Sequence, residues 1–329
     1  MSLQSLTSDS DFIELLRCPV TGARLEKLGD SLVSTDRGLH YPIVEGIPCL
    51  LPQLDPTHSG YAMVMAENLR DQQSGGATYY KTTRDYLKEM LVPTCGNLYH
   101  NARLEQYPIP TFPNELFGYE NVLDIGCNWG RWSIAAAQQG HRVVGVDIHL
   151  ESLRIAQKVA DELNVIPRPR FVLADARSLP FHGDAFDGVF SYSVLQHFSK
   201  SNTKVILNEV NRLLRADGVS LIQMPNAKAL RSLMVLARRG FSEGAEFDVR
   251  YYAIPELLEM FSEAIGVSTW SVDCFLGLNV HREGYDMVSP SSKCVIATAG
   301  VLYKVAEHFS PLKRLADSVF VRSQKADSP

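Results

Sequence analysis

The residues best placed to bind a ligand lie between positions 122 and 147, where a glycine-rich turn is followed by an acid. The stretch reads VLDIGCNWGRWSIAAAQQGHRVVGVD. Asp147 stands about 20 residues beyond the turn formed around Gly126 and Gly130, which is the spacing found in nucleotide-binding units. An aspartate at the end of a strand can accept hydrogen bonds from ribose hydroxyls. The pattern therefore predicts a site for a nucleoside.

The elements that hold this turn can be assigned from residue types. Residues 122–125 are apolar and β-prone, which predicts a short buried strand. Residues 132–139 are rich in alanine, a strong helix former, and Gly140 stands where a helix C-cap glycine belongs. Residues 142–146 predict a second buried strand that ends on Asp147. The order of strand, turn, helix and strand places the acid beside the glycines.

The residues of the turn distinguish between nucleoside ligands. A dinucleotide fingerprint requires G-x-G-x-x-G facing a pyrophosphate, whereas Gly126, Asn128 and Gly130 alternate here and Asp124 precedes them. An acid at the mouth of the turn repels a pyrophosphate and suits an ammonium group. The stretch resembles motifs I and II of class I S-adenosylmethionine methyltransferases, whose motif I reads D-x-G-x-G-x-G. Asn128 departs from that pattern, but asparagine tolerates a left-handed backbone. A glycine turn in another α/β protein is the alternative.

The resemblance implies a fold, a cofactor and a set of binding residues. The fold is α/β, a Rossmann-like sheet of seven strands whose reversed last strand lies between strands five and six. The cofactor is S-adenosylmethionine, with Asp175 facing the adenine amine and Arg103 meeting the methionine carboxylate. The cofactor-binding residues expected on this basis are Asp124, Gly126, Cys127, Asn128, Gly130, Asp147, Ile148, Asp175, Ala176, Ser191 and Arg103.

His197 is the residue best suited to acid–base catalysis. His197 ends the phrase YSVLQH, which follows the predicted fourth strand, residues 186–191. This phrase resembles the segment that lines the methyl-transfer site in that family. An imidazole with a pKa near 6.5 can take a proton from a hydroxyl nucleophile. The alternative is that His197 only packs or hydrogen-bonds beneath the site.

Residues 1–54 form a separate, β-rich module in this interpretation. The phrases LLRCPVTGARL and YPIVEGIPCLLP resemble the Trm112-like domain, which stands alone or activates methyltransferases as a partner or fused segment. Zinc-binding members carry a CPxC pair, but Thr21 stands where Cys18 would have its mate, and Cys49 lies in an apolar segment. Structural zinc needs about four ligands, so no metal is expected. The module either contacts a partner or only caps the catalytic domain.

Residues 55–118 are expected to connect the module to a methyltransferase domain over 119–329. Helices are predicted over 78–91, ended by Pro93, and over 98–106. Downstream, a helix over 203–214 is expected to stop at Asp217-Gly218, before the fifth strand. A basic helix over 227–239 either binds an anionic substrate or presents a solvated face.

Composition limits the partners. The net charge of −5 and the pI of about 6.0 argue against a dominant nucleic-acid surface, and no apolar run reaches the length of a membrane span. The six cysteines are scattered, and the start of the chain lacks a secretory pattern. A reduced, cytoplasmic protein is the expectation, and the oligomeric state stays open.

These observations lead to one main functional hypothesis and two alternatives. The main one is methyl transfer from S-adenosylmethionine to oxygen of a small molecule, such as a sugar, a lipid-linked precursor or a natural product. The first alternative is methylation of RNA or protein, which the family role of the N-terminal module suggests. The second is a non-catalytic scaffold that binds S-adenosylmethionine.

Overall fold

The computed structural model describes residues 8–52, 82–100, 102, 104–245, 247–276 and 282–326. The predicted boundary between residues 54 and 55 falls outside these ranges, as does Arg103. Within the described ranges, none of the helices has the length and apolar character needed to cross a bilayer.

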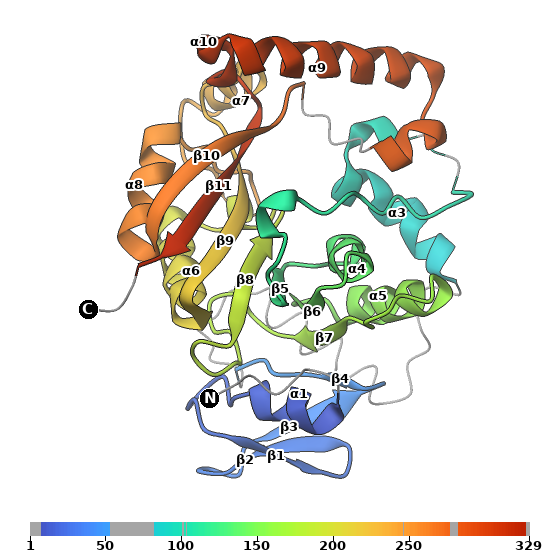
Figure 1. Ribbon diagram of the computed structural model, residues 1–329, viewed down its shortest axis with the longest axis vertical. Helices are drawn as coiled ribbons and strands as arrows, with labels where there is room; N and C mark the ends of the chain where they lie inside the picture. Colours follow the sequence, from blue (N-terminus) through green and yellow to red (C-terminus); the bar gives the residue numbers. More distant parts are fainter. Residues whose placement is uncertain are drawn as a thin grey trace.

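A mixed sheet of seven strands forms the centre of the molecule (Figure 1), in the order β10-β11-β9-β8-β5-β6-β7. The strand next to the end, β11, runs antiparallel to both β9 and β10, whereas the other pairs are parallel. The predicted fold class and the predicted place of the reversed strand are therefore confirmed. The strands are β5 (Asn121–Ile125), β6 (Arg142–Asp147), β7 (Arg170–Leu173), β8 (Phe186–Ser191), β9 (Leu214–Pro225), β10 (Gly266–Cys274) and β11 (Ser318–Lys325).

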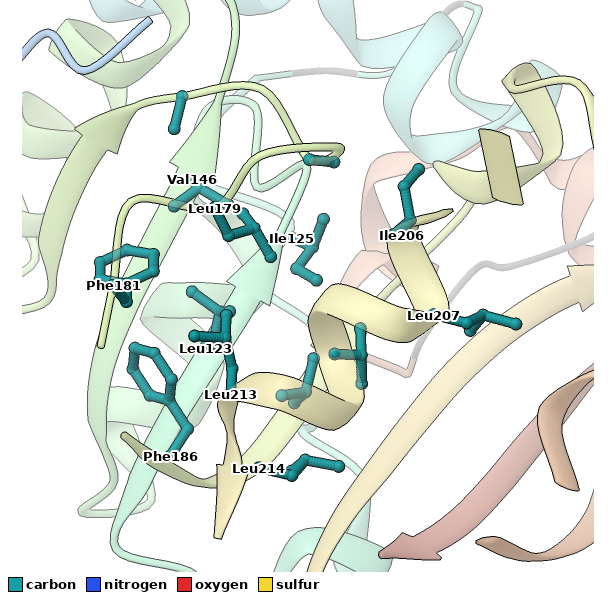
Figure 2. Packing of buried hydrophobic residues seen from close by; sticks show 14 of the residues in the cluster. Leu123, Ile125, Val146, Leu179, Phe181, Phe186, Ile206, Leu207, Leu213 and Leu214 are labelled. Carbon is teal, nitrogen blue, oxygen red and sulfur yellow. The ribbon is translucent and has the colours of Figure 1, made fainter. Parts of the chain in front are cut away.

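Helices cover both faces of this sheet. Successive strand residues have side chains on opposite faces, and both faces of β5 carry buried apolar side chains. Leu123 of β5 packs with the cluster that includes α6 and α8, whereas its neighbour Val122 packs with the cluster that includes α3 and α4. Figure 2 shows Leu213 and Ile206 of α6 against Leu123 and Ile125 of β5. The helices are α3 (Thr83–Cys95), α4 (Arg131–Gln138), α5 (Leu150–Glu162), α6 (Lys200–Leu213), α7 (Leu230–Arg238), α8 (Ile254–Ala264), α9 (Pro290–His308) and α10 (Ser310–Lys313).

The helix before the glycine turn differs from its prediction. Pro93 lies inside α3, which continues to Cys95 and ends at Gly96, where φ is 100°. The proline removes a single backbone donor in the last turn of the helix, and Trp129 Nε1 donates to Thr94 Oγ1 at 3.0 Å just beyond it. Instead of the helix expected over 98–106, the described residues there contain only the end of a 3₁₀ turn, η1 (Asn97–Tyr99).

The end of α6 also differs from its prediction. The helix ends at Leu213, and Asp217-Gly218 lies within β9 rather than terminating the helix. Asp217 has a φ of 61°, and the register of β9 against β8 shifts between Phe186 and Gly188. The two residues therefore form a bulge in the strand, for which the same turn-forming residue types are suited.

The N-terminal module consists of α1 (Asp9–Leu15) and a four-stranded sheet of β1 (Leu25–Leu28), β2 (Ser31–Ser34), β3 (His40–Val44) and β4 (Ile47–Pro48). It lies beside β7, an end strand of the large sheet (Figure 1). Cys49 forms a parallel bridge with Leu173 of β7, and Leu50 N donates to the Leu173 carbonyl at 2.8 Å.

Packing joins the module to the rest of the molecule as well. Phe12, Leu16 and Leu32 of the module belong to the same buried cluster as Leu123 of β5. Arg154 of α5, 7% exposed, forms an ion pair of 2.9 Å with Glu45. The module and the large sheet thus share one core.

Candidate functional site

The turn between β5 and α4 has the left-handed backbone that its residues predict. The φ angles are 74° at Gly126, 47° at Asn128 and 78° at Gly130. The N–H groups of Gly126 and Cys127 donate to the Val146 carbonyl at 2.8 and 3.0 Å, which ties the turn to the end of β6. The prediction that Asn128 adopts a left-handed conformation in place of a glycine is confirmed.

Space as well as conformation requires the two glycines. A Cβ atom at Gly126 would lie 2.3 Å from Cγ2 of Val194, and one at Gly130 would lie 2.8 Å from Cβ of Ala156. Val194 belongs to the segment after β8 that was expected to line the methyl-transfer site. The glycines therefore let that segment and α5 pack directly on the turn.

Asp147 lies at the end of β6 and is bonded to the turn. Its Oδ2 accepts from the N–H of Asn128 at 2.9 Å, and its Oδ1 accepts from the N–H of His149 at 2.9 Å. Burial raises the pKa of Asp147, and these two donors oppose the rise. Asp147 as a residue is half-buried, and each carboxylate oxygen keeps a lone pair for a further donor such as a ribose hydroxyl. Ile148, the next residue, is half-buried.

Asp124 occupies a more enclosed position beneath the turn. Ser133 Oγ donates to its Oδ2 at 2.6 Å, and the residue is 2% exposed. Burial raises the pKa of Asp124 from 3.8 to about 7, Ser133 opposes the rise, and the charge of Asp147 adds to it. A cationic group beside Asp124 would favour the ionised form, so the carboxyl suits the ammonium ligand that its place in the sequence suggested.

Asp175 follows β7 and is 7% exposed, next to the equally buried Ala176. The guanidinium of Arg177 binds both of its carboxylate oxygens, with Nε 3.0 Å from Oδ1 and Nη2 2.5 Å from Oδ2. The backbone N–H of Arg177 donates to Oδ1 as well, at 2.9 Å. An adenine amine would therefore share this carboxylate with a neighbouring cation.

Two further predicted residues have their side chains in the interior. Ser191 at the end of β8 is fully buried, and its Oγ donates to the Ile125 carbonyl at 2.9 Å. Cys127 is buried in a cluster with Cys49 and Leu150. If these positions contact a ligand, backbone groups make the contact.

His197 lies in a 3₁₀ turn, η3 (Leu195–His197), with both ring nitrogens near polar partners. Its Nδ1 is 2.8 Å from the Phe247 carbonyl, so Nδ1 carries the proton, and its Nε2 is 3.2 Å from Nε2 of Gln196. Burial lowers the pKa of His197, and the carbonyl opposes that shift. The ring is thus neutral near pH 7, but the lone pair that a base requires faces a side-chain amide.

Two polar residues near the turn went unnoticed in the sequence. Tyr86 of α3 donates its hydroxyl to Asn128 Oδ1 at 3.2 Å and lies 2.6 Å from Ser152 Oγ of α5. Arg131, the first residue of α4, is 4% exposed. The arginine had a usable signal, a cation inside an apolar helix, whereas Tyr86 meets the turn only through the fold.

A metal centre has no support in the ranges given above, where His, Cys, Asp and Glu form no group of three or more suited to an ion. Cys18 Sγ lies 3.1 Å from the Tyr41 hydroxyl and is buried. Cys49 is buried as well, and burial raises the pKa of its thiol to about 12. Both thiols are part of the packing.

Two segments of the chain match protein families. Residues 122–218 match the methyltransferase domain family, and residues 9–46 match the Trm112p-like protein family. The first match contains the glycine turn, Asp147 and Asp175, and the second contains most of the N-terminal module.

The curated relatives named here each match less than half of the chain. The malonyl-(acyl-carrier protein) O-methyltransferase of Hamiltonella defensa is 33% identical over 117 residues, which is 36% of this chain and 41% of that protein. The ubiquinone biosynthesis O-methyltransferase of Actinobacillus pleuropneumoniae is 31% identical over 126 residues, 37% of this chain and 52% of that protein. The chain thus spans about half the length of these relatives.

A solved structure of phosphoethanolamine N-methyltransferase 2 from Haemonchus contortus, in complex with S-adenosyl-L-methionine, is similar with a TM-score of 0.48. Its sequence identity is 17%, over 76% of this chain and 61% of that chain.

A methyltransferase domain implies S-adenosylmethionine as its cofactor, and the groups around the turn fit that molecule. Asp147 has acceptors for ribose hydroxyls, Asp124 would be stabilised in its ionised form by an ammonium group, and Arg131 has a buried N–H group without a partner among the described residues. The two family matches and the strand order lead to the same assignment. The chain contains a class I methyltransferase domain, and a Trm112p-like domain precedes it.

Proposed function

We propose that this protein catalyses methyl transfer from S-adenosylmethionine to an oxygen atom of a small molecule, such as a sugar, a lipid-linked precursor or a natural product. The observation that carries the proposal is the bonding of Asp147 to the left-handed turn at Asn128. It forms a rigid acceptor for a ribose at the end of β6. The two curated relatives named above are O-methyltransferases by name, which favours oxygen as the acceptor atom.

In this proposal the chain holds the cofactor along the carboxyl ends of β5, β6 and β7. Asp147 binds the ribose hydroxyls, Asp124 lies beside the ammonium group, and Asp175 accepts from the adenine amine once Arg177 yields part of its carboxylate. The other assigned contacts, made largely by backbone groups, are those of Gly126, Cys127, Asn128, Gly130, Ile148, Ala176 and Ser191. Arg103 lies outside the described residues, and its assignment to the methionine carboxylate stays a prediction.

When bound, the cofactor supplies an activated sulfonium methyl group. The chain then has to align the acceptor with it and exclude water. His197 is proposed as the base for a hydroxyl acceptor, for which Gln196 must release Nε2. If His197→Gln leaves the turnover rate unchanged while the protein still binds cofactor, the base role is wrong.

The test is an acceptor screen with S-adenosylmethionine that carries an isotopically labelled methyl group. Small-molecule extracts and pure hydroxyl compounds are incubated with the wild-type protein, and Asp147→Ala serves as the matched control. Label in a small organic product, absent with the control, supports the proposal. Cofactor binding without label transfer to any extract would favour the scaffold alternative.

A second candidate function is methylation of RNA or protein, which the match of residues 9–46 to the Trm112p-like family favours. The same screen separates the two. Label that enters a macromolecular fraction and disappears after nuclease or protease treatment supports the second candidate. Binding to RNA would also weaken steeply as salt is raised.

The division of the chain into a module over 1–54, a connector over 55–118 and a catalytic domain over 119–329 is part of this proposal. Because the module and the sheet share one core, we expect them to unfold in a single thermal transition. Two separated transitions in calorimetry would contradict that expectation.

A further inference from the structure

The buried guanidinium of Arg131 has fewer polar partners than its position requires. The residue is 4% exposed, and its Nη2 has no hydrogen-bond partner in the part of the chain that the structure describes. No ion pair joins Arg131 to a described Asp or Glu. Asp124 and Arg131 interact through their charges, which opposes the rise that burial causes in the pKa of Asp124, but no ion pair joins them. Since a cation taken out of water needs a counter-charge or full hydrogen bonding, the described residues leave this guanidinium short of a directly paired anion.

Two other buried arginines show how the chain treats such a group elsewhere. Arg154 is 7% exposed and forms ion pairs with Glu45 at 2.9 Å and Glu151 at 3.4 Å. Arg250 is 6% exposed, and its Nη1 donates to the carbonyls of His197 and Asp248 at 3.0 and 2.7 Å. Each has its terminal nitrogens paired with oxygen, whereas Arg131 does not.

The surroundings of Arg131 are aromatic. Its guanidinium carbon lies 5.1 Å from the centre of the Trp132 ring and 5.6 Å from that of Tyr192. The Cys95 thiol and the Tyr99 phenol also interact with it. Cation–π contacts are weaker than a paired carboxylate, and neutral thiols and phenols supply no charge. The Tyr192 hydroxyl itself donates to Asp273 Oδ2 at 3.0 Å.

The position of Arg131 connects it to the proposed site. It follows Gly130, the last residue of the glycine turn, and Tyr192 follows Ser191 at the carboxyl end of β8. Cys95 and Tyr99 come from α3 and η1, which pack over the same face of the sheet. The guanidinium therefore lies between the cofactor turn, the segment after β8 and the preceding helices.

We propose that Arg131 binds the carboxylate of one of the two reactants, completing a charge pair that the described residues leave unmade. For the cofactor carboxylate, Arg131 acts in addition to the predicted Arg103. The inference rests on the proposed methyltransferase function and names a residue for which no role follows from the turn itself. The carboxylate comes either from the methionine part of the cofactor or from the acceptor, and a guanidinium fork suits both.

The test for the cofactor carboxylate is a binding comparison by calorimetry. S-adenosylmethionine and decarboxylated S-adenosylmethionine are titrated into the wild type, Arg131→Met and Arg131→Lys. If Arg131 holds the cofactor, the wild type prefers the carboxylated form by roughly 10- to 100-fold. Arg131→Met then loses that preference, and Arg131→Lys keeps part of it.

The acceptor source is tested with benzoate and the neutral benzyl alcohol as probes, titrated into protein saturated with S-adenosylhomocysteine. The aromatic rings beside Arg131 suit such a probe. If the acceptor supplies the carboxylate, the wild type binds benzoate better than the alcohol, Arg131→Met abolishes the difference, and the cofactor preference stays unchanged.

The matched control is Arg154→Met, which removes a buried arginine that already has acidic partners. It should lower the melting temperature and leave both preferences intact. Arg131→Met that keeps both preferences would overturn the inference. If that variant does not fold, a wild type that binds S-adenosylmethionine but shows neither preference overturns it equally. A wild type that fails to bind S-adenosylmethionine at all refutes the proposed function instead.

Discussion

The ends of β6 and β7 each present an aspartate to the same edge of the sheet, but the two carboxylates are bonded differently. Asp147 accepts from two backbone N–H groups, of Asn128 and His149. Asp175 is held by the guanidinium of Arg177. Backbone donors fix the geometry of a carboxylate without neutralising its charge, whereas an arginine does both. Asp147 is thus ready for a neutral donor, and Asp175 has to exchange one partner for another.

Of the substitutions considered, removal of the Asp147 carboxylate should have the largest effect on cofactor affinity, because this carboxylate has no cation to displace. Asp147→Ala should weaken S-adenosylmethionine binding by about 1–3 kcal/mol, roughly 5- to 150-fold, because ribose donors lose a charged acceptor and the turn loses its tie at Asn128. Calorimetry measures the affinity. Unchanged binding would remove Asp147 from the site.

Asp124 is a third aspartate near the turn, and it extends the comparison of Asp147 with Asp175 because it is only 2% exposed. Its pKa of about 7, against an ordinary 3.8, means that the folded protein holds this proton more tightly than the unfolded chain. The stability of the unliganded protein should therefore fall as pH rises from about 4 to about 7. Asp124→Asn should abolish that fall and weaken cofactor binding about tenfold at pH 8, where the ammonium loses its counter-charge.

Melting curves from pH 4 to 8 and calorimetry at pH 6 and pH 8 check both parts. In the wild type, affinity should rise between the two pH values as Asp124 ionises. A wild type whose affinity is the same at both values would mean that no cation of the ligand meets this carboxyl.

Asp175→Asn probes the occupied carboxylate directly. The amide oxygen still accepts from an adenine amine, and part of the charge was already balanced by Arg177, so affinity should fall only about two- to fivefold. Equilibrium competition with S-adenosylhomocysteine is sensitive enough to measure this. A loss as large as that for Asp147→Ala would show that the ion pair does not weaken the acceptor.

Arg177→Met frees the same carboxylate and should have the smallest effect, a gain in cofactor affinity of up to about twofold, offset by the loss of a partly exposed ion pair. The double variant Asp175→Asn/Arg177→Met should then resemble Asp175→Asn alone. A clear loss of affinity in Arg177→Met would indicate that the arginine itself touches the ligand.

The sheet of seven strands and the place of its reversed strand were predicted from the family resemblance, whereas the turn and single strands were predicted from local signals. Strand 186–191 follows from a β-prone run, and the left-handed Asn128 follows from a residue type that tolerates positive φ. Pro93 gave a wrong prediction for the end of its helix, because proline is also tolerated in a helix's last turn. Asp217-Gly218 gave a wrong prediction of a helix end, because the same residue types suit a bulge in a strand. A cation at the start of an apolar helix marks Arg131 in the sequence. Its lack of an acidic partner among the described residues depends on segments distant in the chain meeting in space, which no spacing reveals.

The bridge between Cys49 and Leu173 has a consequence for anyone who shortens the chain. A fragment starting near residue 119 would expose N–H and C=O groups of β7 that the N-terminal module covers. Exposed edge strands pair with strands of other molecules. We expect such a fragment to aggregate. Co-expression of residues 1–54 should raise the yield of soluble fragment, because this segment covers the edge of β7 again. On this expectation the N-terminal module prevents β7 from pairing with strands of other molecules.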